Sequence, residues 1–209
     1  MSKEPFEVLA HETVKIFLHK LKRCPLFYDD LNIPPPITDT LLLEEQSVLK
    51  LKEQQVLVAQ GEVSHSVYWL EQGLVRAVFT DENGKEITKE FFWEGDIILQ
   101  PRSLLTGEPL PYSIVTLEPC HYRMISISKY LQAVERSSEW QQYHQRLLEI
   151  HLVNKERKEE FLLLNSPEKR VARFGETFPW LINRIPDYIV ASYLGMTAIS
   201  YSRIKKRLA

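Results

Sequence analysis

The side chains best suited to chemical recognition lie together near the C-terminus of the 209-residue chain. Most of them are short and polar or basic, and the segment comprises Thr197, Ala198, Ile199, Ser200, Ser202, Arg203 and Lys206. A helix with Ser, Thr and Arg on its free side fits the major groove of DNA, where arginine pairs with guanine edges and a following lysine meets phosphates. These residue types therefore predict a surface that binds double-stranded DNA.

The residues around this segment have the spacing of two short helices that cross steeply. The crossing needs a small residue where the backbones meet, which is Ala191, and a turn residue with positive φ, which is Gly195 four positions later. Leu194 and Ile204 occupy apolar positions that anchor the two helices, and Thr197 can cap the second helix. The pattern predicts a helix-turn-helix whose second helix covers about 197–208.

The charge distribution separates this end of the chain from the rest. Residues 165–209 carry eight Lys or Arg against three Asp or Glu, whereas the preceding 164 residues carry 18 against 25. A basic end on an acidic chain indicates two modules, of which the basic one faces a polyanion. An ordinary fluctuation of surface charge is the alternative.

The middle of the chain is rich in Val, Ile, Tyr and Phe, in short segments separated by turn residues. The predicted strands are Val56–Gln60, Ser66–Gln72, Leu74–Thr80, Glu86–Trp93, Ile97–Gln100, Tyr112–Leu117 and His121–Ser126. Asn83-Gly84 predicts a tight hairpin, since both residues tolerate positive φ. Many short strands at this spacing favour an antiparallel barrel or double-sheet roll.

Helical patterns lie on both sides of the β-rich part. Glu4–Leu21 repeats apolar residues at three- and four-residue steps, Pro34-Pro35-Pro36 forces an extended connector, and Thr38–Lys50 fits a second short helix. Ser128–Leu164 has no Gly or Pro and favours a long helix with one break near residues 136–138. Because this helix has more than one apolar face, we expect it to join two copies in a homodimer. Packing wholly on the β-rich module is the alternative.

These patterns together predict an α+β fold with four parts. They are an N-terminal helical extension over 1–36, an antiparallel, jelly-roll-like β-roll over 37–127, a long dimerisation helix over 128–164 and a helix-turn-helix domain over 165–209. The last domain begins with Ser166-Pro167-Glu168, in which Ser caps a helix, Pro fits its first turn and Glu favours its positive end.

Composition excludes several other classes of protein. With only two cysteines, Cys24 and Cys120, the chain has neither a disulfide framework nor, on its own, an all-thiolate zinc or iron–sulfur site. No apolar run approaches the roughly 20 residues of a membrane span. The start, Met1-Ser2-Lys3-Glu4-Pro5, lacks the apolar core of a secretory signal, so we expect a soluble, cytoplasmic protein.

A metal-dependent β-barrel enzyme is the rival class of protein. Its metal site needs two histidines two positions apart on one strand, whereas the roll offers only His65 and His121. His144 and His151 could meet their copies at a metal in a dimer, or occupy ordinary heptad positions. Gly-x-Ser-x-Gly, Walker-type and His-Glu-x-x-His motifs are missing. We therefore expect no enzymatic activity and no metal site.

From Thr38 to Leu208 the chain resembles the bacterial regulators grouped around the cyclic-AMP receptor protein and the fumarate–nitrate regulator, the Crp/Fnr family. The motifs that carry the resemblance are Ser166-Pro167-Glu168-Lys169-Arg170, Phe178-Pro179, Val190–Thr197, Ser202-Arg203-Ile204, Gly73-Leu74-Val75-Arg76 and Glu94-Gly95-Asp96. The resemblance implies a sensor roll, a dimer helix and a helix-turn-helix, with Arg203 contacting a base and Thr197 and Ser200 contacting phosphates. It also implies RNA polymerase as a partner.

Two positions on the second helix depart from the family pattern. Ile199 stands where many members carry an acid that accepts from cytosine, and its apolar side chain can meet only a thymine methyl. Ala198 stands where others carry Arg or Pro, and the β-wing that often follows the second helix is missing. We therefore expect a different DNA site from the one that the best-known members read.

The family's cyclic-nucleotide pocket is also altered. Binders hold the ribose-phosphate with a Phe-Gly-Glu turn and an Arg-Ser pair, because the phosphate needs an arginine and the ribose hydroxyl a carboxylate. Here Gly95-Asp96 runs into Ile97 without Gly-Glu, the Arg-Ser pair is Tyr112-Ser113, and Arg102 is out of register. We expect no cyclic-nucleotide binding and no cofactor, although one of the six histidines could hold haem.

The sequence thus predicts a homodimeric, sequence-specific transcription regulator that acts on a two-fold DNA site without cyclic AMP. The alternative is a ligand-binding or protein-interaction module whose helix-turn-helix does not bind DNA. No residue is assigned to an effector.

Overall fold

The computed structural model describes residues 47–208. The predicted N-terminal extension, its helix at Glu4–Leu21 and most of the helix predicted at Thr38–Lys50 lie outside the described residues. The described end of that second helix was predicted wrongly, because Leu49–Leu51 forms strand β1 and pairs antiparallel with β8. Strand pairing gives this segment backbone partners from the distant Cys120–Tyr122, which its local apolar pattern did not indicate.

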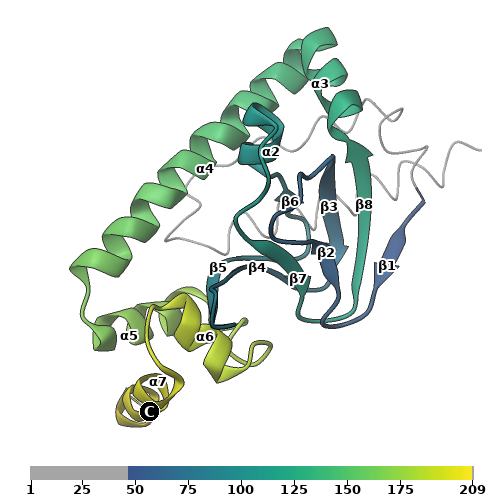
Figure 1. Ribbon diagram of the computed structural model, residues 1–209. Helices are drawn as coiled ribbons and strands as arrows, with labels where there is room; N and C mark the ends of the chain where they lie inside the picture. Colours follow the sequence, from purple (N-terminus) through teal and green to yellow (C-terminus); the bar gives the residue numbers. More distant parts are fainter. Residues whose placement is uncertain (1–46, 209) are drawn as a thin grey trace, which may run out of the picture.

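Two four-stranded antiparallel sheets face each other to form the roll (Figure 1). One sheet has the order β1-β8-β3-β6, with β8 at Cys120–Ser126, β3 at Ser66–Gln72 and β6 at Ile97–Ile98. The other has the order β2-β7-β4-β5, formed by Val56–Val58, Ser113–Thr116, Val75–Thr80 and Glu86–Phe92. The predicted α+β class with an antiparallel roll is confirmed. Helix α2, at Pro101–Thr106, is an element that the strand pattern did not predict.

The hairpin between β4 and β5 forms where Asn83-Gly84 predicted it. The Gly84 N–H donates to the Asp81 carbonyl at 3.0 Å, and Asp81 Oδ1 accepts from the N–H groups of Asn83 and Lys85 at 2.9 Å each. The predicted hairpin is confirmed, and of its two turn residues only Gly84 takes the left-handed conformation, with φ of 77°. The Asp81 carboxylate organises the remainder of the turn as an Asx-type cap.

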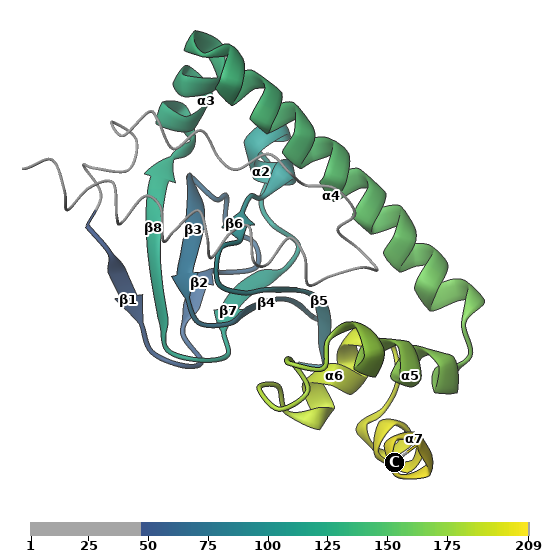
Figure 2. The ribbon, with the colours of Figure 1, turned by 180° about the vertical axis from the view of Figure 1, so that it is seen from behind.

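Two helices follow the roll, separated by a break at Ser137. Helix α3 spans Ile127–Arg136 and α4 spans Ser138–Leu164, so the helix is interrupted within the predicted interval of residues 136–138. The Ser137 side chain accepts from the Trp140 N–H and begins the new helix. From this capped start, α4 runs past the roll as one rod and carries the C-terminal helices at its far end (Figures 1 and 2).

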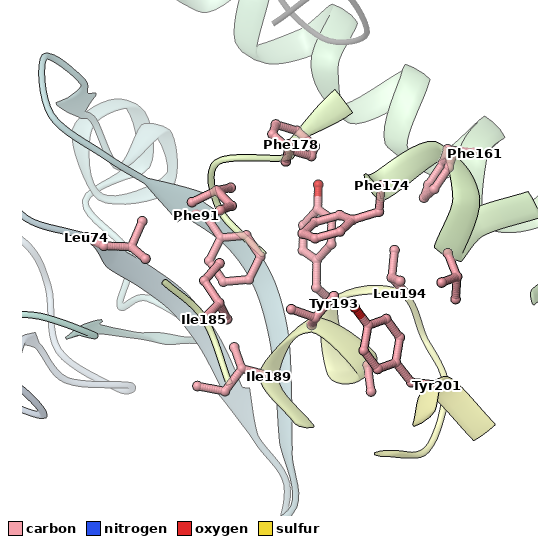
Figure 3. Close-up of a cluster of buried hydrophobic side chains, with 14 of the residues drawn as sticks. Leu74, Phe91, Phe161, Phe174, Phe178, Ile185, Ile189, Tyr193, Leu194 and Tyr201 are labelled. Carbon is pink, nitrogen blue, oxygen red and sulfur yellow. The ribbon is translucent and has the colours of Figure 1, made fainter. Parts of the chain in front are cut away.

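The C-terminal helices, which we call the head, share a hydrophobic core with the roll. The head comprises α5 (Pro167–Thr177), α6 (Asp187–Tyr193) and α7 (Ala198–Leu208). Its buried side chains form one cluster with Leu74, Phe91 and Trp93 of the roll, and Figure 3 shows Phe91 beside Tyr193 and Phe174. Burial of shared apolar area holds two modules together, so the head is packed on the roll as well as tethered to it.

Candidate nucleic-acid interface

Helices α6 and α7 are joined by a tight turn at Gly195. The residues predicted to anchor the pair are buried: Ala191 is 1%, Leu194 0% and Ile204 5% exposed. Gly195 has a φ of +66°, and the Met196 N–H donates to the Ala191 carbonyl at 3.0 Å. Arg170 of α5 donates from Nη1 to the Leu194 carbonyl at 2.5 Å, which ties the turn to the first helix of the head.

Thr197 begins α7 as its cap. Its Oγ1 accepts from the Ser200 N–H at 3.2 Å and lies 2.9 Å from Ser200 Oγ. Capping fixes the direction of α7 and satisfies a backbone donor in its first turn. The two hydroxyl groups thus stand together at the exposed start of the helix.

Most residues assigned from sequence to DNA contact stand on the exposed side of α7. Thr197, Ala198, Ile199, Ser200, Arg203 and Lys206 are exposed, and Ser202 is half-buried. Ile199 is 67% exposed. The inward side of the same helix carries Tyr201 and Ile204, which are 2% and 5% exposed.

The basic residues of α7 divide into paired and unpaired groups. Lys205 Nζ lies 2.7 Å from Asp187 Oδ1, and Arg207 Nη2 lies 2.8 Å from Glu168 Oε1. Within the described residues, Arg203 and Lys206 make no such ion pair. Both line a hollow between α7 and the start of α5. Since the first turn of a helix carries partial positive charge, this hollow and the two free cations suit phosphate or base-edge contacts.

The side chains that the resemblance relates to the cyclic-nucleotide pocket make contacts within the protein. Tyr112 is buried, with Lys89 Nζ 4.9 Å from its ring centre. Arg102 donates from Nε to Glu108 Oε2 at 2.7 Å on an exposed surface. Asp96 Oδ2 accepts from the Trp93 N–H at 2.8 Å and closes its own turn. Arg102 is therefore paired with Glu108 in this structure.

His144 and Cys120 make ordinary structural contacts. His144 Nδ1 lies 2.8 Å from the Tyr130 hydroxyl, and burial raises the pKa of the Cys120 thiol to about 11. Among residues 47–208, no group of three or more His, Cys, Asp or Glu is placed to hold a metal ion. Over the same residues, every helix is too short or too polar to cross a membrane.

Sequence reasoning missed the residues that connect the head to the roll and to α4. Lys158 of α4 donates to the Lys89 carbonyl and lies 3.8 Å from the ring centre of Tyr193. Burial lowers the pKa of Lys158 to about 7, although Glu90 favours its charged form. Arg184 and Ser192 also contact the roll, as described below. Lys158 and Arg184 belong to none of the motifs found in the sequence, and Ser192, which lies within Val190–Thr197, was not predicted to contact the roll.

The turn conformation at Gly195 gives a stability prediction. We expect Gly195→Ala to lower the free energy of unfolding by about 1–2 kcal/mol, because a left-handed backbone is strained with a Cβ. The new Cβ would also lie 3.2 Å from Arg170 Nη1. Gly84→Ala is the matched control, since Gly84 also has positive φ but its Cβ would meet nothing within 4 Å. Urea unfolding measures both, and a smaller loss at Gly195 than at Gly84 would contradict the role of the Arg170 contact.

Comparison with known proteins finds a similar domain in the roll. Residues 48–137 match the model of the cyclic nucleotide-binding domain. The cAMP-activated global transcriptional regulator CRP of Pasteurella multocida is 27% identical over 103 residues, which cover 48% of this chain and 49% of that protein. The matched segment thus spans about half the length of this curated relative.

Solved structures match most of the described chain. FixK2 from Bradyrhizobium japonicum superposes with a TM-score of 0.70 and 18% identity, over 78% of this chain and 84% of that one. A transcriptional regulator of the CRP family from Thermus thermophilus gives a TM-score of 0.61 and 18% identity over 77% and 83%. Residues 48–137 are therefore similar to a cyclic nucleotide-binding domain, and a helical head follows them in the chain. The protein has the fold of the Crp/Fnr regulators, which confirms the resemblance found in its sequence.

Proposed function

We propose that the protein is a sequence-specific transcription regulator that binds double-stranded DNA as a homodimer. The observation that carries the proposal is the exposed face of α7, where Arg203 and Lys206 form no ion pair with any described residue. Two-fold symmetry of the dimer would place one α7 in each of two major grooves about one helical turn apart. CRP of Pasteurella multocida, whose name describes a transcriptional regulator, supports that part of the proposal.

The exposed apolar residues of α4 support the dimer. Leu152 and Leu163 are 69% and 73% exposed, and Val153 and Leu164 are 42% and 77% exposed. The members of each pair are separated by about three helical turns, so the four residues lie along one side of α4. These are two apolar pairs of neighbouring residues, with the exposed Glu156 and Glu160 between them on the same side of the helix. Each pair is best covered by the same helix of a second copy.

Regulation without cyclic AMP is part of the proposal. Tyr112 stands where the family's phosphate-binding arginine would be, and Lys89 is already engaged with Glu90 at 2.9 Å. A phosphate placed there would lack the bidentate partner that such sites use. We further propose that the protein acts without catalysis, cofactor or metal, in the cytoplasm, with RNA polymerase as a partner.

Selection of random duplex DNA by the purified protein, without added ligand and at moderate salt, tests the proposal. We expect enrichment of an inverted repeat with half-sites about one helical turn apart. Enrichment only after cyclic AMP is added would contradict the independence from that ligand. Continued failure with cyclic nucleotides and cell extract would contradict DNA binding.

The second candidate function is a protein-interaction module. Ile199, which is 67% exposed on α7, favours it, because an apolar side chain there suits a protein surface as well as a thymine methyl. Salt distinguishes the two functions. In a plot of the logarithm of DNA affinity against the logarithm of salt concentration, each phosphate contact contributes about −0.9 to the slope. A protein partner imposes no such slope.

A further inference from the structure

The turn between α5 and α6 is attached to the roll through one arginine. Arg184 donates to both oxygens of Glu118, from Nε at 2.9 Å and from Nη2 at 2.7 Å. It also donates to both oxygens of Glu94, from Nη2 at 2.6 Å and from Nη1 at 3.3 Å. The three side chains are only 26–29% exposed. A guanidinium that is mostly shielded from water and binds two carboxylates forms an attachment of specific geometry.

The two carboxylates belong to turns at the same end of the roll. Glu94 lies between β5 and β6, and its Oε1 also accepts from the Gly73 N–H at 3.3 Å. Glu118 lies between β7 and β8. On the head side, Trp180 packs edge-on against Trp93 at 5.0 Å and lies 5.7 Å from the Arg184 guanidinium. The attachment therefore joins ordered parts of both modules.

A second contact seats α6 on the open edge of β5. The Thr88 N–H donates to Ser192 Oγ at 2.7 Å, and the Ser192 hydroxyl donates to the Glu86 carbonyl at 3.1 Å. β5 is the last strand of its sheet, so these backbone groups face away from β4. Next to this edge, Phe91 and Tyr193 pack with ring centres 5.0 Å apart (Figure 3). Protection of the Thr88 amide thus reports whether the head is docked.

We propose that Arg184 is a positioning residue, which fixes the orientation of α7 relative to the roll in the absence of any ligand. The shared apolar core and Ser192 hold the head against the roll, but apolar packing has little directionality. The four hydrogen bonds of Arg184 add a directional attachment that limits rotation of the head about the Asn165–Ser166 link. In a dimer, fixed heads select one spacing of half-sites. This inference rests on the proposed function, because spacing matters only if the heads bind DNA.

The test compares Arg184→Gln with the wild-type protein on duplexes whose half-site spacing varies and on a single half-site. We expect the preference for one spacing to fall by about tenfold or more, because pivoting heads lose effective concentration at the correct spacing and gain it elsewhere. Affinity for the single half-site should change by less than about twofold. The matched control is Arg123→Gln, since Arg123 pairs with Glu71 at 2.6 Å and with similar exposure inside the roll.

The double variant Glu94→Gln/Glu118→Gln separates positioning from charge. It changes the net charge in the opposite direction to Arg184→Gln, yet we expect the same loss of spacing preference. Unchanged spacing preference in both variants would overturn the inference, and so would an equal loss in Arg123→Gln.

Hydrogen exchange of the full chain without DNA provides an independent measurement. In Arg184→Gln the amide of Thr88 should exchange about tenfold faster or more, with the pairing of β4 and β5 unchanged. If the wild-type protein binds no duplex, the proposed function fails, and exchange still decides whether Arg184 holds the head. Unchanged exchange at Thr88 would overturn the role of Arg184.

Discussion

Replacement of Leu152 and Leu163 together by aspartate is expected to convert the dimer to a monomer and to weaken binding to a two-fold DNA site by about 10²–10⁴-fold. The two side chains are 69% and 73% exposed on one side of α4, so the substitutions disturb little within a single copy. In a dimer, four carboxylates would enter the helix interface and repel one another across it. A monomer then loses the effective concentration that links its two heads.

Sedimentation velocity and DNA titration measure the two effects. Leu105→Asp is the matched control, because Leu105 is 60% exposed but lies on α2 rather than α4. We expect this control to remain dimeric and to bind as the wild-type protein does. If Leu152→Asp/Leu163→Asp is also dimeric with unchanged affinity, the second copy does not cover this side of α4.

Arg203→Ala is expected to reduce the free energy of binding to the selected DNA sequence by about 1–3 kcal/mol and to weaken discrimination at one base pair. Arg203 is exposed on α7 and has no ion-pair partner among residues 47–208, so its guanidinium is available for bidentate contact with a guanine edge. Because the side chain contributes nothing to the core of the head, the free energy of unfolding should remain as it was.

Lys206→Ala is the comparison that separates base reading from phosphate contact. Lys206 is also exposed and borders the same hollow as Arg203. We expect its loss to weaken binding to all DNA sequences alike and to reduce the slope of log affinity against log salt concentration by about 1. Unchanged binding of the selected sequence by Arg203→Ala would show that the base-reading side chains lie elsewhere on the head.

The local elements of this protein could be predicted from short patterns of residues. Gly84 marks the hairpin of β4 and β5, Ser137 begins α4, and Ser166 begins α5 by accepting from the Lys169 N–H at 3.3 Å. These features depend on residues within about one turn of each other, so a local pattern contains the whole cause. The exposed face of α7 followed from the same kind of reasoning.

Strand β1 and helix α2 show where that reasoning failed. Leu49–Leu51 has no strong strand pattern of its own, and it is a strand because β8 offers backbone partners at Cys120–Tyr122. Helix α2 begins at Pro101, and two contacts from the distant Ser64 fix its start: Ser64 Oγ donates to Gln100 Oε1 at 3.2 Å, and the Ser64 N–H donates to Ser103 Oγ at 3.1 Å. In both places a distant contact decided the local conformation.

By itself, the sequence determined the antiparallel roll, the two helices after it and the outward face of α7, because hydrophobic period, caps and turn residues act over a few positions. Only the tertiary structure decided that the head is packed on the roll. Arg184 meets Glu118 and Glu94 across 66 and 90 positions, and Ser192 meets Thr88 across 104. Contacts at such separations leave no periodic pattern in the chain, since they exist only after the modules have folded and come together.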